Sequence, residues 1–246
     1  MKIFISTSDG YDFLMRPFMH LFNKFWGEQS VTILGYREPP FSLLENFNFI
    51  SLADKQETPN QWASDHNRFF SSIDDSHFIW SLEDTFLLRP VNFKIYNSLL
   101  RHLDDENIGR ISLCNPIKNT QHKEIEILEA HSEIELEQDS HDRISVVWSL
   151  WKRDYILKYL RDGWSPWDTE IRGSQLAKND GWRIIGSKSN HVVDYASAHR
   201  ISGRGLPGGE LDFRYTNRRH LMLDPESLKE LISLGMINDR LQLIKK

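Results

Sequence analysis

The chain has 246 residues, of which 39% are hydrophobic and 26% charged, a composition typical of a folded globular protein rather than a disordered one. Its formal net charge is −5 and no long basic run is present, which argues against nucleic-acid binding, because that needs a positive surface. A single cysteine excludes a disulfide framework, and the lack of any apolar stretch of about 18 residues excludes a membrane-spanning helix.

Predicted strands and helices alternate through the first half of the chain. In chain order, the apolar patterns predict a strand at 2–6, a helix at 11–26, strands at 30–35 and 49–52, a helix at 60–73, a strand at 77–82, a helix at 90–103 and a strand at 108–114. This alternation is typical of an α/β protein with a mainly parallel sheet. Because the strand at 2–6 has no signal-peptide core before it, we expect a cytoplasmic protein.

The second half of the chain is more polar. Residues 118–142 are acidic, and alternating Glu and Ile predict an exposed hairpin with strands at 124–128 and 133–136. Further elements are predicted in this order: a strand at 144–150, helices at 153–161 and 166–178, a strand at 182–185 and a helix at 225–234. No repeat or low-complexity tract stands out, so we predict a single domain that carries the acidic hairpin as an insertion.

Two adjacent carboxylates, Glu83 and Asp84, follow the predicted strand at 77–82. Open α/β sheets bind their ligands at the carboxyl ends of their strands. Carboxylate oxygens in that position suit a hard divalent cation, and such a cation commonly bridges phosphates. The pattern therefore indicates an enzyme that handles a phosphorylated or nucleotide-linked substrate. In the alternative interpretation, the pair only begins a loop and caps the next turn.

A second acidic segment accompanies two tryptophans. Asp168 and Glu170 follow Trp164 and Trp167, and Pro166 predicts the start of a helix there. A carboxylate near the positive end of a helix stays ionised, so either acid is a candidate general base. Alternatively, Asp168 caps the helix and leaves Glu170 to face a cleft. The tryptophans are candidates for stacking on a substrate ring, with burial in the core as the alternative.

Positive charge gathers late in the chain around the glycine-rich stretch 203–209. Arg204 lies within it, and further arginines flank it, which suits a loop that folds over phosphates; a solvated tail is the alternative. His66 lies on the apolar face of the helix predicted at 60–73, where we expect a core histidine. P-loop, GxGxxG and GxSxG motifs are absent, which argues against P-loop, Rossmann dinucleotide and serine-hydrolase chemistry.

The order of these features resembles a GT-A-fold glycosyltransferase, in particular the family 2-like group of nucleotide-sugar enzymes. The matching segments, which span residues 1–200, are Ser6-Thr7-Ser8, Asp65-His66-Asn67-Arg68, Glu83-Asp84-Thr85 at the place of the DxD motif, and Trp164 to Glu170 at the acceptor segment. The resemblance implies a GT-A-like (Rossmann-like) α/β fold, with a mostly parallel sheet flanked by helices. It divides the domain at 1–204 into a nucleotide-binding half at 1–115 and an acceptor half at 116–204, followed by a C-terminal lid or helical tail at 205–246.

The resemblance also implies a role for each candidate residue. Donor contacts are expected from Thr7, Asp9, Arg68, Glu83, Asp84 and Arg204. A divalent cation, Mn²⁺ or Mg²⁺, is expected on Glu83, Asp84 and His199, although a lone late histidine is more often a structural or surface residue. The catalytic base is expected to be Asp168 or Glu170 in an inverting reaction, with Trp164 and Trp167 on the acceptor side.

One residue departs from the family pattern. Thr85 stands where the DxD motif has its final aspartate, so three outcomes stay open: a cation held mainly by Asp84, a weakly bound cation, or none. The implied function is transfer of a sugar from a nucleotide diphosphate to a hydroxyl of a glycan or lipid-linked acceptor, in surface polysaccharide or glycan synthesis. Such an enzyme works in the cytoplasm or at the inner face of a membrane.

Two alternatives from other classes stay open. A nucleotidyltransferase shares the fold style and the metal chemistry, but the loop after its first strand is usually basic, whereas Thr7-Ser8-Asp9-Gly10 is not. The second alternative is a non-catalytic glycan-binding module that keeps the fold.

Overall fold

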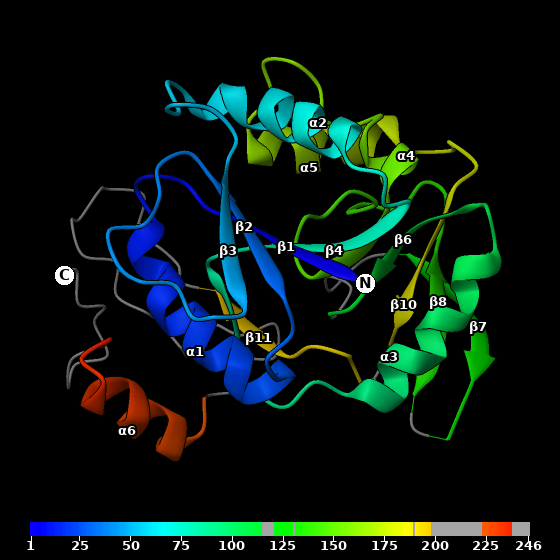
Figure 1. Cartoon of the computed structure of the whole chain (residues 1–246). Coiled ribbons are helices and arrows are strands. Elements are labelled where there is room, and N and C mark those ends of the chain that lie inside the picture. Colours follow the sequence, from blue (N-terminus) through cyan, green and yellow to red (C-terminus); the bar gives the residue numbers. More distant parts are fainter. Residues whose placement is uncertain (115–120, 130, 189, 198–222, 238–246) are drawn as a thin grey trace.

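A mixed β-sheet forms the centre of the molecule (Figure 1), and the computed structural model describes residues 1–114, 121–129, 131–188, 190–197 and 223–237. Within these residues the sheet has nine strands in the order β3-β2-β1-β4-β9-β6-β10-β8-β7. Their bounds are β1 Lys2–Ser6, β2 Val31–Gly35, β3 Phe47–Ser51, β4 His77–Leu82, β6 Ile108–Ser112, β7 His122–Ile127, β8 Ser132–Leu136, β9 Ser149–Lys152 and β10 Arg183–Ser187. A separate small sheet pairs β5 (Thr85–Leu87) with β11 (Tyr195–Ser197).

Most strands of the large sheet run in one direction. β3, β2, β1 and β4 pair in parallel, β9 runs antiparallel between β4 and β6, and β10 is parallel to β6. β8 pairs antiparallel with β10, and β7 antiparallel with β8. Of the nine described strands, seven therefore share one direction and only β8 and β9 oppose it. This confirms the predicted α/β class with a mostly parallel sheet.

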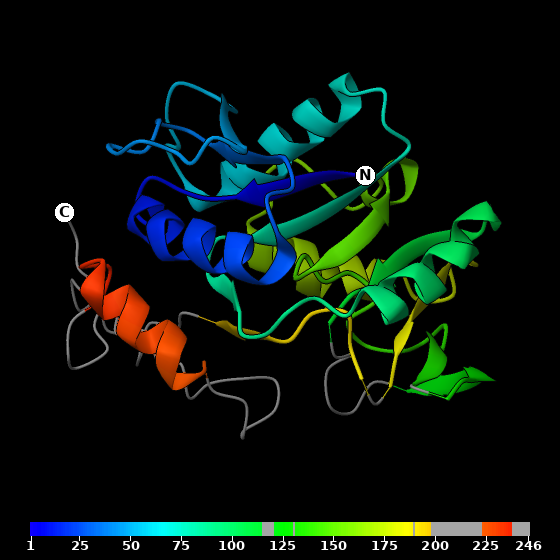
Figure 2. The same cartoon turned by 60° about the horizontal axis from the view of Figure 1, so that its bottom comes forward.

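Helices cover both faces of the sheet (Figures 1 and 2). α1 (Met15–Trp26) and α3 (Phe93–Leu100) lie on one face, and α2 (Trp62–Ser72), α4 (Arg153–Ile156) and α5 (Pro166–Leu176) lie on the other. Short 3-10 turns at Asp12–Leu14, Pro59–Gln61 and Arg101–Asp104 adjoin α1, α2 and α3. Among the described residues, no helix has the length and apolar character needed to cross a membrane.

The late helix α6 (Pro225–Ser233) packs against α1, and it confirms the helix predicted at 225–234 (Figure 2). Glu230 of α6 pairs with Lys24 at 2.7 Å and with His20 at 3.2 Å, both on α1. Leu231 is buried beneath this contact. α6 begins where the Asp224 side chain accepts a hydrogen bond from the backbone N–H of Ser227, which satisfies a free donor of the first turn.

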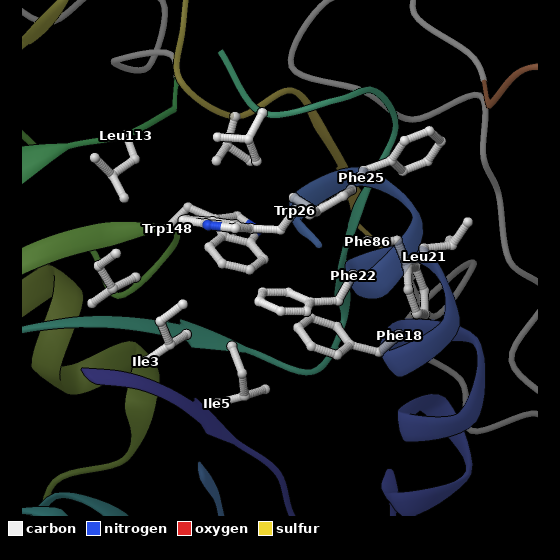
Figure 3. Close-up of a cluster of buried hydrophobic side chains, with 14 of the residues drawn as sticks. Ile3, Ile5, Phe18, Leu21, Phe22, Phe25, Trp26, Phe86, Leu113 and Trp148 are labelled. Carbon is white, nitrogen blue, oxygen red and sulfur yellow. The ribbon is translucent and has the colours of Figure 1, made fainter. Parts of the chain in front are cut away.

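Trp148 lies at the centre of the core between the sheet and α1 (Figure 3). Its indole stacks on Phe18 at 6.0 Å and on Phe22 at 6.4 Å, and it contacts Trp26 at 5.3 Å between ring centroids. Ile3 and Ile5 of β1 face the same core. The helix forms here because Phe18, Phe22 and Trp26 recur at helical spacing and give α1 one apolar face.

The opposite core contains a fully satisfied polar network. Trp80 of β4 stacks on Trp62 of α2 at 5.2 Å, and its Nε1–H donates to Ser6 Oγ at 2.7 Å. His66 Nδ1 lies 2.7 Å from the carbonyl oxygen of Trp62, so this nitrogen carries the proton and Nε2 accepts from Ser6 Oγ. Burial lowers the pKa of His66 to about 3. The expectation of a neutral core histidine is therefore confirmed.

Two predicted elements differ from the structure. The apolar run 144–150 is not a continuous strand, because Trp148 has a positive φ of 31° and β9 starts only at Ser149. Residues 144–148 form a bend that lets Trp148 enter the core. The acidic hairpin forms as β7 and β8, but it is only partly exposed, because β8 joins the sheet and buries Ile134 and Leu136.

Replacing Gly109 tests the packing of α4 on the sheet. A Cβ at this position of β6 would lie 2.6 Å from the ring of the fully buried Tyr155 in α4. We expect Gly109→Ala to lower the free energy of unfolding by about 1–3 kcal/mol, measured by urea denaturation. Gly10→Ala is the matched control, since a Cβ there meets no atom within 4 Å. Equal stability of the two variants would contradict this packing.

Candidate functional site

The predicted acidic pair lies in the turn between β4 and β5, at the carboxyl end of the parallel strands. The backbone N–H of Glu83 donates to the carbonyl oxygen of Ser6 at the end of β1, at 3.1 Å. Glu83 is buried, and Asp84 is partly buried. The sequence thus placed both carboxylates at the edge where open α/β sheets bind ligands.

Both carboxyl groups are held in an environment that opposes their charge. Burial and the adjacent Asp84 raise the pKa of Glu83 well above its usual range, although the backbone N–H of Ser8 favours the ionised form. Burial raises the pKa of Asp84 to about 6. Thr7 Oγ1 lies beside the Glu83 carboxyl group, but its geometry falls short of a hydrogen bond, and it has no partner among the described residues.

The chemistry of the acidic pair suits a bound divalent cation. Asp84 Oδ1 is buried, and no hydrogen-bond partner for it occurs in the described part of the chain. A cation between two carboxylates would offset both the burial and their mutual repulsion. No group of three or more His, Cys, Asp or Glu side chains within the described ranges could hold a metal ion. Within this part of the chain, a cation at the acidic turn would be held by Glu83 and Asp84 alone.

Thr85 points away from the acidic pair and stabilises its turn. Its hydroxyl donates to the carbonyl oxygen of Leu82 at 2.6 Å, so Ser81 Oγ donates to Thr85 Oγ1 at 2.9 Å. Ser81 Oγ in turn accepts the backbone N–H of Trp148 at 3.0 Å, and the Trp148 indole N–H donates to the carbonyl oxygen of Thr85. All three side chains are buried, so Thr85 does not replace the missing aspartate as a ligand.

Asp9, predicted to contact the donor, forms a two-point contact with a residue that the sequence analysis missed. The Asp9 carboxylate accepts from the backbone N–H and the Nε–H of Arg37, at 3.0 and 2.8 Å. This contact joins the loops that follow β1 and β2. No spacing in the sequence links residues 9 and 37, so only the parallel pairing of the two strands could have indicated it.

Arg68, the third predicted donor contact, pairs with Asp65, a residue to which the sequence analysis gave no role in the site. Its Nη2 donates to the carbonyl oxygen of Leu52 and to Asp65 Oδ1, at 2.8 and 2.9 Å. Asp65 is buried, and its other oxygen has no partner among the described residues. Burial, followed by the charge of Asp65, raises the pKa of the neighbouring Tyr36. The structure therefore brings Arg68 and Asp9 close to Tyr36 and Asp65 at the ends of β1 and β2.

The two candidate bases have different surroundings. Asp168 completes a capping box with Ser165 at the start of α5, and its carboxylate also pairs with Arg172 at 3.1 Å. Hydrogen bonds from Ser165 hold the pKa of Asp168 below its usual range. Glu170 accepts the backbone N–H of Val146 at 2.8 Å, and burial raises its pKa. The alternative in which Asp168 is the N-cap residue is therefore wrong, because Ser165 is the N-cap and Asp168, at the third helical position, completes the capping box.

The predicted tryptophans also differ from each other. Trp164 is half-buried, and the guanidinium groups of Arg161 and Arg172 lie over its ring at 5.5 and 5.9 Å. Trp167 is 64% exposed, which is unusual for an indole. Only Trp167 therefore offers an open face to a solvent-borne ligand.

Two predicted residues, His199 and Arg204, lie outside the described residues. The described chain leads toward them through β11, in which Ser197 pairs opposite Thr85 in β5. The chain thus passes the acidic turn just before residue 198.

Comparison with known proteins finds no matching family model and no matching curated sequence. Among solved structures, the chain is similar to the bifunctional IspDF from Campylobacter jejuni, with 12% identity and a TM-score of 0.44 over 77% of this chain and 50% of that one. It is also similar to the mannosyltransferase PcManGT from Pyrobaculum calidifontis in complex with GDP-Man and Mn²⁺, with 10% identity and a TM-score of 0.46 over 83% and 57%.

A third similar structure is a cytidylyltransferase from Leptospira borgpetersenii, with 11% identity and a TM-score of 0.47 over 95% of this chain and 86% of that one. The chain spans only about half the length of the first two structures. At such low identities and TM-scores, these similarities assign neither a family nor an activity.

The raised pKa of Asp84 predicts a pH-dependent cost in stability. The folded-state pKa is about 6, against 3.8 for an unperturbed group, so between these values the folded protein binds more protons than the unfolded chain. Stability therefore falls as the pH rises from about 4 to about 6, by about 1–3 kcal/mol from this group. We expect Asp84→Asn to abolish this fall, measured by urea denaturation in buffer with EDTA. A stability difference between the two proteins that stays constant with pH would contradict the environment described for Asp84.

Proposed function

We propose that this protein is a GT-A-like, nucleotide-sugar-dependent glycosyltransferase. One observation carries the proposal: two adjacent carboxylates, both with raised pKa values, lie at the carboxyl edge of a mostly parallel sheet, and no cationic side chain among the described residues pairs with them. Charged groups in such an environment need a compensating cation or proton. A cation that also binds a diphosphate would meet this need and hold the donor.

Glu83 and Asp84 would hold a divalent cation, Mn²⁺ or Mg²⁺, against the diphosphate of the donor. When bound, the cation supplies positive charge where the leaving diphosphate becomes more negative. The other donor contacts come from Thr7, whose hydroxyl lacks a partner among the described residues, and from the Asp9 and Arg68 region. These groups lie near the ends of β1 and β2, so the nucleoside is proposed to bind next to the acidic turn.

Glu170 is the better candidate for the base. In the proposed reaction, the acceptor oxygen attacks the anomeric carbon, the bond from that carbon to the diphosphate oxygen breaks, and the hydroxyl proton passes to the carboxylate. Burial raises the pKa of Glu170, which favours proton uptake, whereas Asp168 is held ionised by the capping box. A base on the acceptor side corresponds to inversion at the anomeric carbon.

The acceptor is proposed to be a glycan or a lipid-linked glycan, as in surface polysaccharide synthesis. The exposed ring of Trp167 offers a surface on which a sugar can stack, beside the start of α5. Such an acceptor places the enzyme in the cytoplasm or at the inner face of a membrane.

One observation favours a second candidate. Because Thr85 turns into the core, the acidic turn offers two ligands in place of the family's motif, which suits a glycan-binding module without catalysis. Nucleotidyl transfer is less favoured, because the loop at Thr7-Ser8-Asp9-Gly10 carries no basic residue for a triphosphate.

A donor assay tests the proposal. With Mn²⁺ present, we expect at least one of a panel of nucleotide sugars to bind and to be hydrolysed slowly. Asp84→Asn should lower this turnover about a hundredfold, because it removes charge stabilisation at the leaving group. Asp74→Asn is the control, since Asp74 is exposed at the other end of β4.

Each of the other outcomes of the donor assay would indicate a different class of protein or reject the proposal. Pyrophosphate released from a nucleoside triphosphate and a sugar phosphate would indicate a nucleotidyltransferase. Glycan binding without turnover would indicate a binding module, and no interaction with any nucleotide sugar would reject the proposal.

The two acids can be separated by conservative variants. We expect Glu170→Gln to lower kcat at least a hundredfold and to remove the acidic limb of the pH profile, because the proton acceptor is lost. Asp168→Asn should keep kcat within a few-fold and instead lower the melting temperature, because it weakens the capping box. Kinetics and thermal unfolding of both variants check this, and the reverse pattern would assign the base to Asp168.

A further inference from the structure

A pocket lies between α3 and the turn of the acidic hairpin, away from the acidic pair. Its volume is about 470 Å³, within the usual range for small-molecule sites. One wall is a single face of α3 and the start of the following 3-10 turn, with Lys94, Asn97 and Arg101. The other wall is the β7–β8 turn, with Leu128, Glu129 and His131.

A buried, ionised carboxylate lies behind the residues that line this pocket and bonds to three of them, Ser98, Arg101 and His131. Glu133 is fully buried, and it accepts hydrogen bonds from Ser98 Oγ and His102 Nε2, both at 2.6 Å. Arg101 Nη2 and His131 Nε2 lie at 3.2 and 3.3 Å. Burial alone would raise the pKa of Glu133, but these partners together lower it. Glu133 therefore fixes the side chains of Arg101 and His131 at the pocket wall.

The groups that remain available in the pocket are mainly hydrogen-bond donors. Within the described residues, the hydrogen bonds of Arg101 use its Nε and Nη2 atoms, which leaves its Nη1 for a ligand. Lys94 lies 3.7 Å from Glu129, and both side chains are largely exposed, so this pair competes weakly with a ligand. The exception is His131 Nδ1, which is buried and lacks a hydrogen-bond partner within the described residues; in a neutral ring whose Nε2–H faces Glu133, it is an acceptor. Hydrogen-bond donors and cations of this kind bind the oxygens of a carboxylate or phosphate.

The pocket opens at the same edge of the sheet as the acidic pair. β8 runs antiparallel to β10, with Glu133 opposite Ser187, so the hairpin turn lies beyond the carboxyl end of β10. β8 is four strand positions from β4 in the sheet, which corresponds to roughly 19 Å. An extended acceptor could therefore reach both places at once.

We propose that this pocket binds an anionic group, a carboxylate or a phosphate, carried by the sugar acceptor. Lys94 and Arg101 bind the anionic oxygens, Asn97 donates an additional hydrogen bond, and Leu128 contacts the carbon frame of the sugar. The acceptor part of the proposal rests on the proposed glycosyl transfer, whereas the anion site itself does not.

Direct binding tests the site without any nucleotide sugar. Isothermal titration with inorganic phosphate, glucose 6-phosphate and glucuronate should show saturable binding of at least one sugar ligand. Lys94→Gln should weaken it about tenfold, because one charge-assisted hydrogen bond is lost. The variant should fold normally, since Lys94 is exposed. Lys229→Gln on α6, exposed and on the other side of the molecule in Figure 1, is the matched control.

The outcomes separate the two possible sources of the anion. Tighter binding of a sugar acid or phosphosugar than of inorganic phosphate, by about tenfold or more, supports an acceptor group. Equal affinities would overturn the acceptor assignment and indicate a site for a free anion. No saturable binding, or unchanged affinity in Lys94→Gln, would overturn the site. If binding is found but the donor assay fails, the proposed function is rejected while the anion site stands.

Discussion

The arrangement of the acidic turn depends on the burial of one aromatic side chain, Trp148. Its indole stacks against Phe18 and Phe22 on α1, while its backbone and ring N–H groups bind Ser81 and Thr85 on either side of Glu83 and Asp84. A non-glycine residue with positive φ costs about 1–3 kcal/mol. Burial of a large aromatic ring offsets a cost of this size. The strained bend is thus stabilised by packing, and it fixes the turn that carries the carboxylates.

Burial is accompanied by opposite pKa shifts in different acids of this protein. Glu133 has four donors around it, and its pKa is lowered, so its charge is compensated within the fold. Glu83 and Asp84 are also removed from water, but their pKa values are raised, because each faces a like charge or an apolar surrounding. The difference does not follow from residue type or depth. It follows from the partners that the fold supplies, and within the described residues no cationic side chain pairs with the acidic turn.

The sequence predicted well those features that depend on local pattern. The apolar runs at β1, β2 and β4 are short and bounded by turn residues, so the position of Glu83 and Asp84 at the end of a buried strand could be read directly. Features set by side-chain packing and by individual hydrogen bonds were missed. Asp65 falls on the polar side of its helix by spacing, yet it is buried beside Arg68 and Tyr36. Thr85 marks a departure from a motif, but only its bonds to Ser81 and Leu82 explain what the side chain does.

The bend at 144–148 connects the two halves of the candidate site. Val146 donates to Glu170 on α5, and Trp148, two residues later, binds Ser81 and Thr85 beside the acidic turn. The Cys114 thiol donates to the carbonyl oxygen of Val147 between them. A displacement of this segment would therefore move the carboxylate on α5 and the acidic turn together. The apolar run that looked like one more strand in the sequence is the element that sets their relative position, because its side chains enter both cores while its backbone bonds to both acidic segments.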